Sequence, residues 1–166
     1  SDSESMEDYI WSRDYIDAYG DFGNINLSPQ QLLEGMDRLK PRLYSIASSP
    51  EFEPGTVHLT VGIVRYSHHG RDKAGLCTGF LSDMCDVKET DIGIFMSPTR
   101  SFVLPEDKTR DIIMVGPGTG IAPFRAFLEQ REIDNATGKN WLFFGDWTEE
   151  EYYYKEEMED WKKKGI

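Results

Sequence analysis

The sequence predicts two consecutive lobes, a β-rich lobe followed by an α/β lobe with a parallel sheet. Between residues 42 and 98, apolar and polar residues tend to alternate, which is typical of strands with one buried face. From Asp111 onward the pattern changes to strand, helix, strand and helix, which favours parallel strands. We place the boundary near residue 108, so the predicted lobes comprise residues 1–107 and 108–166.

Helical patterns open the first lobe. Residues 9–20 carry apolar side chains at helical intervals. A second helix begins at Ser28, because Pro29 suits the first helical position and Ser28 with Gln31 fits a capping box. Pro41 ends it. The N-terminal part of the first lobe is therefore predicted to be helical.

Short strands follow in the first lobe. Residues 42–46, 57–66 and 92–96 have strand patterns, and the second of these alternates most clearly. The polar residues 67–75 predict a loop, and residues 78–84 predict a short helix. This order favours strand pairing with one buried face.

A glycine turn joins the first strand and the first helix of the second lobe. Residues 112–115 form a buried-strand pattern, and Gly116, Gly118 and Gly120 follow at alternate positions. An apolar run with helical spacing resumes at Ile121. Such a turn points free backbone N–H groups at a phosphate, and the helix N-terminus adds favourable partial charge. A tight turn without any ligand is the alternative.

Arg125 favours the phosphate-binding interpretation, because it adds a cation in the first turn of the helix. The loop is not a P-loop, since no Gly-Lys-Ser/Thr closes it. An ordinary dinucleotide fingerprint fits worse, because its spacing is G-x-G-x-x-G and the spacing here is G-x-G-x-G. The lobe continues with a predicted strand at 140–144 and a helix at 149–164.

The composition argues against several classes of partner. The 166 residues carry a net charge of −12, which disfavours nucleic acid and anionic membranes. No stretch approaches the roughly 18 apolar residues of a membrane span, and the acidic N-terminus is unlike a signal peptide. The two cysteines, Cys77 and Cys85, have no metal-binding spacing, so we predict no metal site and a cytoplasmic setting.

Two further motifs lie in the first lobe. Residues 42–45 place an Arg, a Tyr and a Ser around one Leu, a set that can pair with phosphate, stack on a planar ring and donate a hydrogen bond. Residues 75–78 provide a glycine and a threonine at a helix start, which suits a second phosphate. The alternatives are an edge strand with a polar face and an ordinary helix start.

The three motifs, at 42–45, 75–78 and 116–127, resemble those of the ferredoxin–NADP reductase superfamily in order and spacing. Within it, the resemblance is greatest to the diflavin branch and to the flavoproteins of NADPH-dependent sulfite reductases. It covers about residues 25–166. It implies that the first lobe is part of an antiparallel Greek-key barrel that binds FAD. It also implies that the second lobe is the first half of an NADP-binding α/β lobe.

The resemblance also implies roles for individual residues. Arg42 would hold the FAD pyrophosphate, Tyr44 would stack on the isoalloxazine, and Ser45, the catalytic candidate, would lie near flavin N5. The full set of implied FAD-binding residues is Arg42, Leu43, Tyr44, Ser45, Thr60, Val61, Gly62, Tyr66, Gly75, Leu76, Cys77 and Thr78. The implied NADPH-binding residues are Gly116, Gly118, Thr119, Gly120, Pro123 and Arg125.

The implied activity is hydride transfer from NADPH to FAD. The implied electron route continues through an FMN-containing flavodoxin-like module to a haem and iron–sulfur sulfite reductase subunit. Several family elements, including early barrel strands and the grip on the NADP 2′-phosphate, have no counterpart in the sequence, so we expect both lobes to be incomplete. The alternative is a non-catalytic or complementing fragment that needs a partner chain, or a homo-oligomer, for activity. Residue 146 is Asp where many relatives outside the sulfite reductase branch carry a cysteine that assists hydride transfer, and we expect Cys77 to serve packing.

Overall fold

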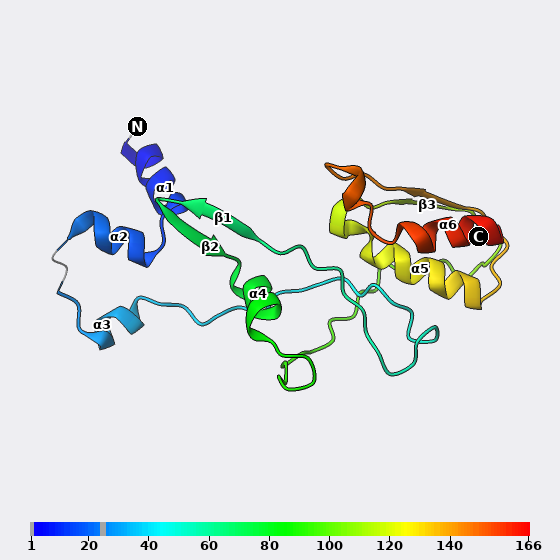
Figure 1. Cartoon of the computed structure of the whole chain (residues 1–166), viewed down its shortest axis with the longest axis horizontal. Helices are drawn as coiled ribbons and strands as arrows, with labels where there is room; N and C mark the ends of the chain where they lie inside the picture. The colour runs from blue at the N-terminus through cyan, green and yellow to red at the C-terminus, as the bar shows by residue number, and fades with distance from the viewer. Residues whose placement is uncertain (1, 24–25) are drawn as a thin grey trace. The chain divides into compact units, whose positions relative to one another are not determined.

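The computed structural model describes residues 2–23 and 26–166. The chain forms two compact units, of which one comprises Ser1–Pro41 and Tyr66–Lys73 and the other comprises Arg42–Arg65 and Ala74–Ile166 (Figure 1). The boundary near residue 108 concerns the predicted family domains and stays a prediction. Each unit is described separately below.

The first unit contains three helices, α1 (Asp2–Ser12), α2 (Tyr15–Phe22) and α3 (Pro29–Glu34). The single helix expected over 9–20 is two helices, because the Asp14 side chain accepts hydrogen bonds from the N–H groups of Ile16 and Asp17 and starts α2. The predicted capping box at Ser28 is confirmed, since the Ser28 N–H donates to Gln31 Oε1 at 3.0 Å. Helix α3 ends earlier than expected, at Glu34.

A hairpin replaces the loop expected over residues 67–75. Strands β1 (Arg65–His68) and β2 (Arg71–Ala74) pair with each other. The two residues between them, His69 and Gly70, have φ values of 49° and 71°. Positive φ at both central positions is the geometry of a tight two-residue hairpin turn. The polar sequence concealed the strands because their side chains are largely exposed.

Strand pairing in the first part of the second unit is shorter than predicted. Antiparallel pairing is present at the bridge between Ile46 and Leu59, and the Ala47 N–H donates to the His58 carbonyl at 2.8 Å. The expected strand at 92–96 is not formed. The predicted helix at 78–84 is a short helix, α4 (Leu76–Gly79), that continues as one π-helical turn over Phe80–Met84.

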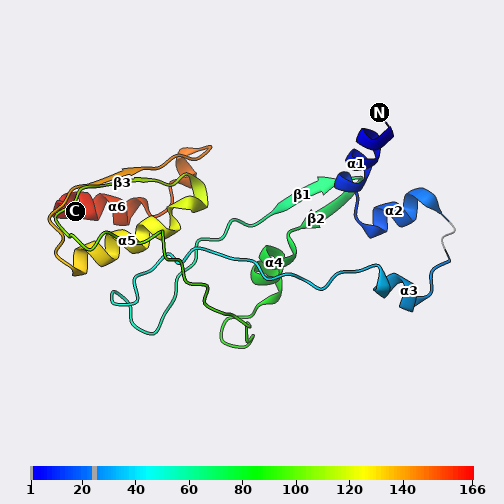
Figure 2. The same cartoon turned by 180° about the vertical axis from the view of Figure 1, so that it is seen from behind.

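The α/β part of the second unit confirms the predicted strand, helix, strand and helix. Strands β3 (Ile112–Val115) and β4 (Asn140–Phe143) are parallel, with Ile112 opposite Asn140. Helices α5 (Ala122–Ile133) and α6 (Lys155–Lys164) lie beside them in both views (Figures 1 and 2). The last helix starts later than residue 149, after Tyr154, whose φ is 58°.

A small core lies between this sheet and its helices. Met114, Leu128 and Trp161 are buried together, and Phe124 and Phe127 pack against them. The opposite face of the two strands is exposed, and it carries Ile113, Val115, Trp141 and Phe143. Among the described residues, no helix is long and apolar enough to cross a membrane.

Candidate functional site

The glycine turn lies where the carboxyl ends of β3 and β4 meet, the edge at which parallel α/β sheets bind ligands. The backbone N–H groups of its three glycines are all used inside the chain. Gly116 donates to the Phe143 carbonyl at 3.0 Å, Gly118 to the Gly145 carbonyl at 3.0 Å and Gly120 to the Pro117 carbonyl at 2.9 Å. These bonds do not favour the expected phosphate contact of the three N–H groups, which stays a prediction. The end of β4 and the residues after it bind the first two N–H groups, and the turn itself binds the third.

The structural need for glycine differs among the three positions of the turn. A Cβ on Gly116 would lie 2.7 Å from the Gly120 carbonyl oxygen and 2.7 Å from Phe124 Cδ2, so close packing requires glycine there. Gly118 has a φ of 54°, a conformation that other residues adopt with strain. A Cβ on Gly120 would have only Pro117 Cδ nearby, at 3.8 Å. Two of the glycines therefore shape the turn, and the third leaves space beside it.

An open hollow of about 630 Å³ lies beside the turn, lined by Pro117, Gly118, Gly145, Asp146 and Trp147. The Asp146 carboxylate borders Gly118, because a Cβ there would lie 3.5 Å from Asp146 Oδ2. The Trp147 side chain is 95% exposed at the rim. Trp147 was not among the predicted site residues, although its place three residues after the second predicted strand was a usable signal.

Thr119 is the polar side chain of the turn that remains available. It is exposed, and its hydroxyl takes part in no hydrogen bond between described residues. Pro123 lies in the first turn of α5, where its missing N–H costs nothing. The electrostatic surroundings are acidic: burial, Asp146 and Glu151 together raise the pKa of Tyr153. A phosphate here would be held by Thr119 more than by the glycines.

Arg125 contacts protein groups at the position where a phosphate contact was expected. Its side chain is 8% exposed, and it pairs with Glu129 at 2.9 Å and with Glu157 at 2.6 Å. It also donates to the Ala47 carbonyl at 2.6 Å and approaches His58 Nδ1 at 3.2 Å. Burial would lower the pKa of Arg125, but the two carboxylates outweigh it and raise it. These partners occupy the guanidinium, so they do not favour the predicted phosphate contact.

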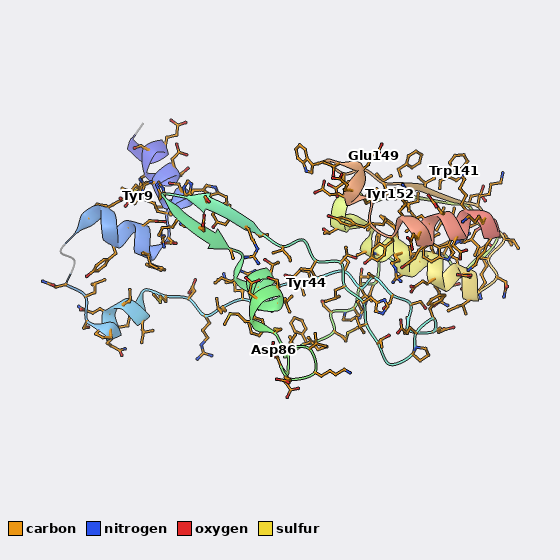
Figure 3. The ribbon with its side chains drawn as sticks, viewed as in Figure 1. Tyr9, Tyr44, Asp86, Trp141, Glu149 and Tyr152 are labelled. Atoms are coloured by element: carbon orange, nitrogen blue, oxygen red, sulfur yellow. The ribbon has the colours of Figure 1, made fainter. Side chains whose placement is uncertain are left out.

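The motif at residues 42–45 meets the motif at 75–78 through Tyr44. A hydrogen bond with the Cys77 side chain, together with burial, raises the pKa of Tyr44, while nearby Arg42 lowers it. Tyr44 is seen beside α4 in Figure 3. Leu43 and Ser45 are exposed. The structure thus brings together two of the predicted FAD-binding motifs, and it gives half-buried Cys77 a packing contact.

The start of α4 retains part of the predicted phosphate cradle. The Gly75 N–H donates to the Val64 carbonyl at 2.9 Å, and the buried Thr78 hydroxyl accepts from the Val64 N–H at 3.2 Å. Thr78 therefore stabilises the turn, and its expected role as a phosphate donor stays a prediction. Gly75 provides no side-chain cap, and no hydrogen bond between described residues uses the N–H of Leu76 or Cys77. These two N–H groups are the donors that fit an anion.

The remaining predicted FAD-binding residues separate into two groups. Thr60 Oγ1 lies 2.7 Å from the Tyr154 hydroxyl, and Val61 is half-buried. A Cβ on Gly62 would lie 3.5 Å from Thr119 Cγ2, so this stretch borders the glycine turn. Tyr66 belongs to the first unit, apart from the other candidates.

Two family models match the chain. The FAD binding domain matches residues 6–80, and the oxidoreductase NAD-binding domain matches residues 114–165. The first match begins well before residue 25, where the sequence resemblance begins. The predicted cofactors, FAD and NADPH, are confirmed at the level of these domains.

Curated relatives align along most of the chain. The sulfite reductase [NADPH] flavoprotein alpha-component of Mannheimia succiniciproducens is 47% identical over 88% of this chain and 24% of that protein. The Bacillus subtilis protein of the same name is 40% identical over 98% of this chain and 27% of that protein. The chain therefore spans about a quarter of the length of the curated relatives it matches.

A solved structure resembles the chain as well. The ferredoxin-NADP+ reductase from Plasmodium falciparum superposes with a TM-score of 0.60 at 29% identity, over 74% of this chain and 45% of that one. The shared fold supports the predicted order of an antiparallel flavin lobe and a parallel nucleotide lobe. The two domain matches in this order, and the relatives aligned along nearly the whole chain, show that it comprises an FAD binding domain followed by an oxidoreductase NAD-binding domain, similar to those of the sulfite reductase flavoproteins and of a ferredoxin-NADP+ reductase.

Proposed function

We propose that this chain forms the FAD- and NADPH-binding part of a reductase that passes electrons from NADPH through FAD towards a sulfite-reductase-type acceptor. The two domain matches and the names of the relatives support this proposal. The proposed partners are an FMN-containing flavodoxin-like module and a haem and iron–sulfur sulfite reductase subunit. The proposed setting is the cytoplasm.

The observation that carries the proposal is the proximity of flavin and pyridine-nucleotide motifs within one compact unit. Gly62 borders Thr119, and Tyr44 contacts Cys77. Hydride transfer needs the nicotinamide and the flavin within a few ångströms of each other, so the two nucleotide sites of such a reductase must adjoin. Motifs that lay in separate units would not support this function.

Each residue has a distinct part in the proposal. The Thr119 hydroxyl donates to a phosphate oxygen of the pyridine nucleotide beside the glycine turn. The N–H groups of Leu76 and Cys77 hold the flavin pyrophosphate. Tyr44 stacks on the isoalloxazine, and the exposed Ser45 hydroxyl lies near its N5 atom. When bound, the two cofactors supply the hydride donor and its acceptor, and the chain's own work is to position them.

Replacing Thr119 tests the pyridine-nucleotide half. Thr119→Val keeps the methyl group that borders Gly62 and removes only the hydroxyl. We expect the Kd for NADPH to rise about tenfold, as for the loss of one hydrogen bond to a charged group. Titration of NADPH fluorescence measures it. Thr137→Val, an exposed threonine of the same α/β part, is the matched control and should leave the Kd unchanged.

Unchanged NADPH affinity in Thr119→Val would show that the turn does not hold the nucleotide as proposed. The flavin half has its own test. Adding FAD to the purified chain should give a bound-flavin absorption spectrum, and Tyr44→Ala should weaken FAD binding without changing NADPH binding. A spectrum identical to that of free FAD would contradict this half.

A second candidate function is that of a complementing fragment, which needs another chain for turnover. The exposed apolar face that carries Ile113, Val115, Trp141 and Phe143 favours it, because single soluble domains rarely leave such a face uncovered. It predicts little NADPH oxidation by the chain alone and restored oxidation with a chain that supplies the remaining domain. Rapid turnover by the chain alone would exclude it.

A further inference from the structure

We infer that Arg125 is a positioning residue that fixes the flavin motif against the pyridine-nucleotide loop, by means of an ion-pair latch in which Arg125 and Glu129 are buried and Glu157 is partly exposed. The latch consists of Arg125, Glu129 and Glu157, which grip the segment Ala47–Ser49. The inference rests on the proposed function, because it concerns the distance between the two nucleotide sites.

The Arg125 guanidinium contacts both the Ala47 carbonyl and the Glu157 carboxylate. Nη1 donates to the Ala47 carbonyl at 2.6 Å and lies 3.2 Å from His58 Nδ1. Nε donates to Glu157 Oε2 at 2.6 Å, and Nη2 donates to Glu157 Oε1 at 3.2 Å. This two-point contact with one carboxylate fixes the plane of the guanidinium. One side chain thereby joins α5 and α6 to the segment that follows the flavin motif.

Glu129 completes the latch from the next turn of α5. Its side chain is 1% exposed and pairs with Arg125 Nη1 at 2.9 Å. Its other oxygen accepts from the Ser49 backbone N–H at 2.6 Å, and the Ser49 hydroxyl donates to Gln130 Oε1 at 2.6 Å. A buried charge that loses its partner is strongly unfavourable, so each member depends on the others. These contacts therefore hold the segment Ala47–Ser49 in one position on α5.

The latch sits next to both nucleotide motifs along the chain. Ala47 follows Ser45 by two positions, and Arg125 lies in the first turns of the helix that starts after Gly120. A displacement of about 1 Å between reacting groups costs about a hundredfold in rate. A rigid contact at this place therefore controls hydride transfer more than it controls the binding of either nucleotide.

The role as a phosphate ligand makes the opposite prediction for Glu129. If Arg125 bound a phosphate, Glu129→Gln would release the guanidinium and strengthen NADPH binding, while Arg125→Gln would weaken it. If Arg125 positions the lobes, both changes act in the same direction, on transfer and not on binding. The pair of variants therefore separates the two roles.

The experiment uses the full chain with FAD and NADPH. We expect Arg125→Gln and Glu129→Gln each to slow flavin reduction at saturating NADPH by about tenfold or more, with the Kd for NADPH changed by less than about threefold. The long-wavelength absorption band of flavin stacked on NADP+ should weaken in parallel. Glu159→Gln, which removes an exposed carboxylate of α6 outside the latch, is the control and should leave both readouts unchanged.

Ser49→Ala guards against unfolding, because it removes the hydroxyl that contacts Gln130 and the Glu51 N–H but keeps the ion pairs, and it should give a smaller change in the same direction. Normal reduction and an unchanged band in folded variants would overturn the inference and leave the proposed function intact. A loss of NADPH affinity in Arg125→Gln with a gain in Glu129→Gln would also overturn it. A wild-type chain that binds neither nucleotide would overturn the proposed function, and the inference with it.

Discussion

Replacing Gly116 and Gly120 by alanine, one at a time, tests how the nucleotide turn is built. Both residues lie outside the positive-φ region, so alanine fits both backbones. At Gly116 the new methyl would lie 2.7 Å from the Gly120 carbonyl oxygen and 2.7 Å from the ring of Phe124. At Gly120 its nearest neighbour would be 3.8 Å away. Both substitutions thus add the same methyl group, but it clashes with its neighbours at Gly116 and has room at Gly120.

The cost at Gly116 follows from what can move. The carbonyl belongs to the backbone of the turn, and the Phe124 ring is held by Phe102 at 5.7 Å and Phe127 at 6.2 Å between centroids. Overpacking of this kind costs about 1–3 kcal/mol, and the lower freedom of the unfolded alanine chain offsets about 0.4–1 kcal/mol of it. We expect Gly116→Ala to lower the free energy of unfolding by about 1–2 kcal/mol.

Gly120→Ala should instead raise the free energy of unfolding by about 0.4–1 kcal/mol, because it meets no obstacle. Urea unfolding, followed by tryptophan fluorescence, measures both. With a slope of about 1–3 kcal/mol per molar urea, the two midpoints should differ by about 1 M. Equal midpoints, or a Gly120→Ala variant that is the less stable, would refute the packing described for the turn.

Two further predictions concern each unit separately. In the first unit, Lys73 and Arg71 hold the pKa of Asp17 below its ordinary value, so its contribution to stability is complete above about pH 4 and is lost as the pH falls below that. The protection factors of α2, which compare its exchange with that of an unstructured chain at the same pH, should therefore fall below pH 4, and in Asp17→Asn they should be low already at pH 7. In the second unit, Trp161→Phe removes the bond from Trp161 Nε1 to Glu132 Oε2, of 2.7 Å, and should lower the free energy of unfolding by about 1.5–3 kcal/mol in a urea titration.

Asp37→Asn, at an exposed position, is the control for the first of these predictions. Equal protection factors at pH 3 and pH 7 would contradict the role of the ion pairs in that unit. For the second, an unchanged urea midpoint in Trp161→Phe would show that the indole bond contributes nothing.

Local patterns predicted the α/β part well. The strand at 112–115, the glycine turn and the helix after it form as expected, because short-range periodicity and glycine backbone freedom act within a few residues. The capping box at Ser28 formed for the same reason. The strands expected at 42–46 and 92–96 depended on partners elsewhere in the chain, and the pairing that formed is one bridge.

The sequence by itself determined the family, the order of the two nucleotide-binding parts and the place of the glycine turn. Only the tertiary structure decided which polar groups remain for a ligand. In the fold, the N–H groups of Gly116, Gly118 and Gly120 donate to carbonyl oxygens of the chain, and Arg125 forms ion pairs with Glu129 and Glu157. The reason is physical: a hydrogen-bonding group is available only if no partner in the fold satisfies it, and the partners Phe143, Gly145 and Glu157 lie far away in the sequence.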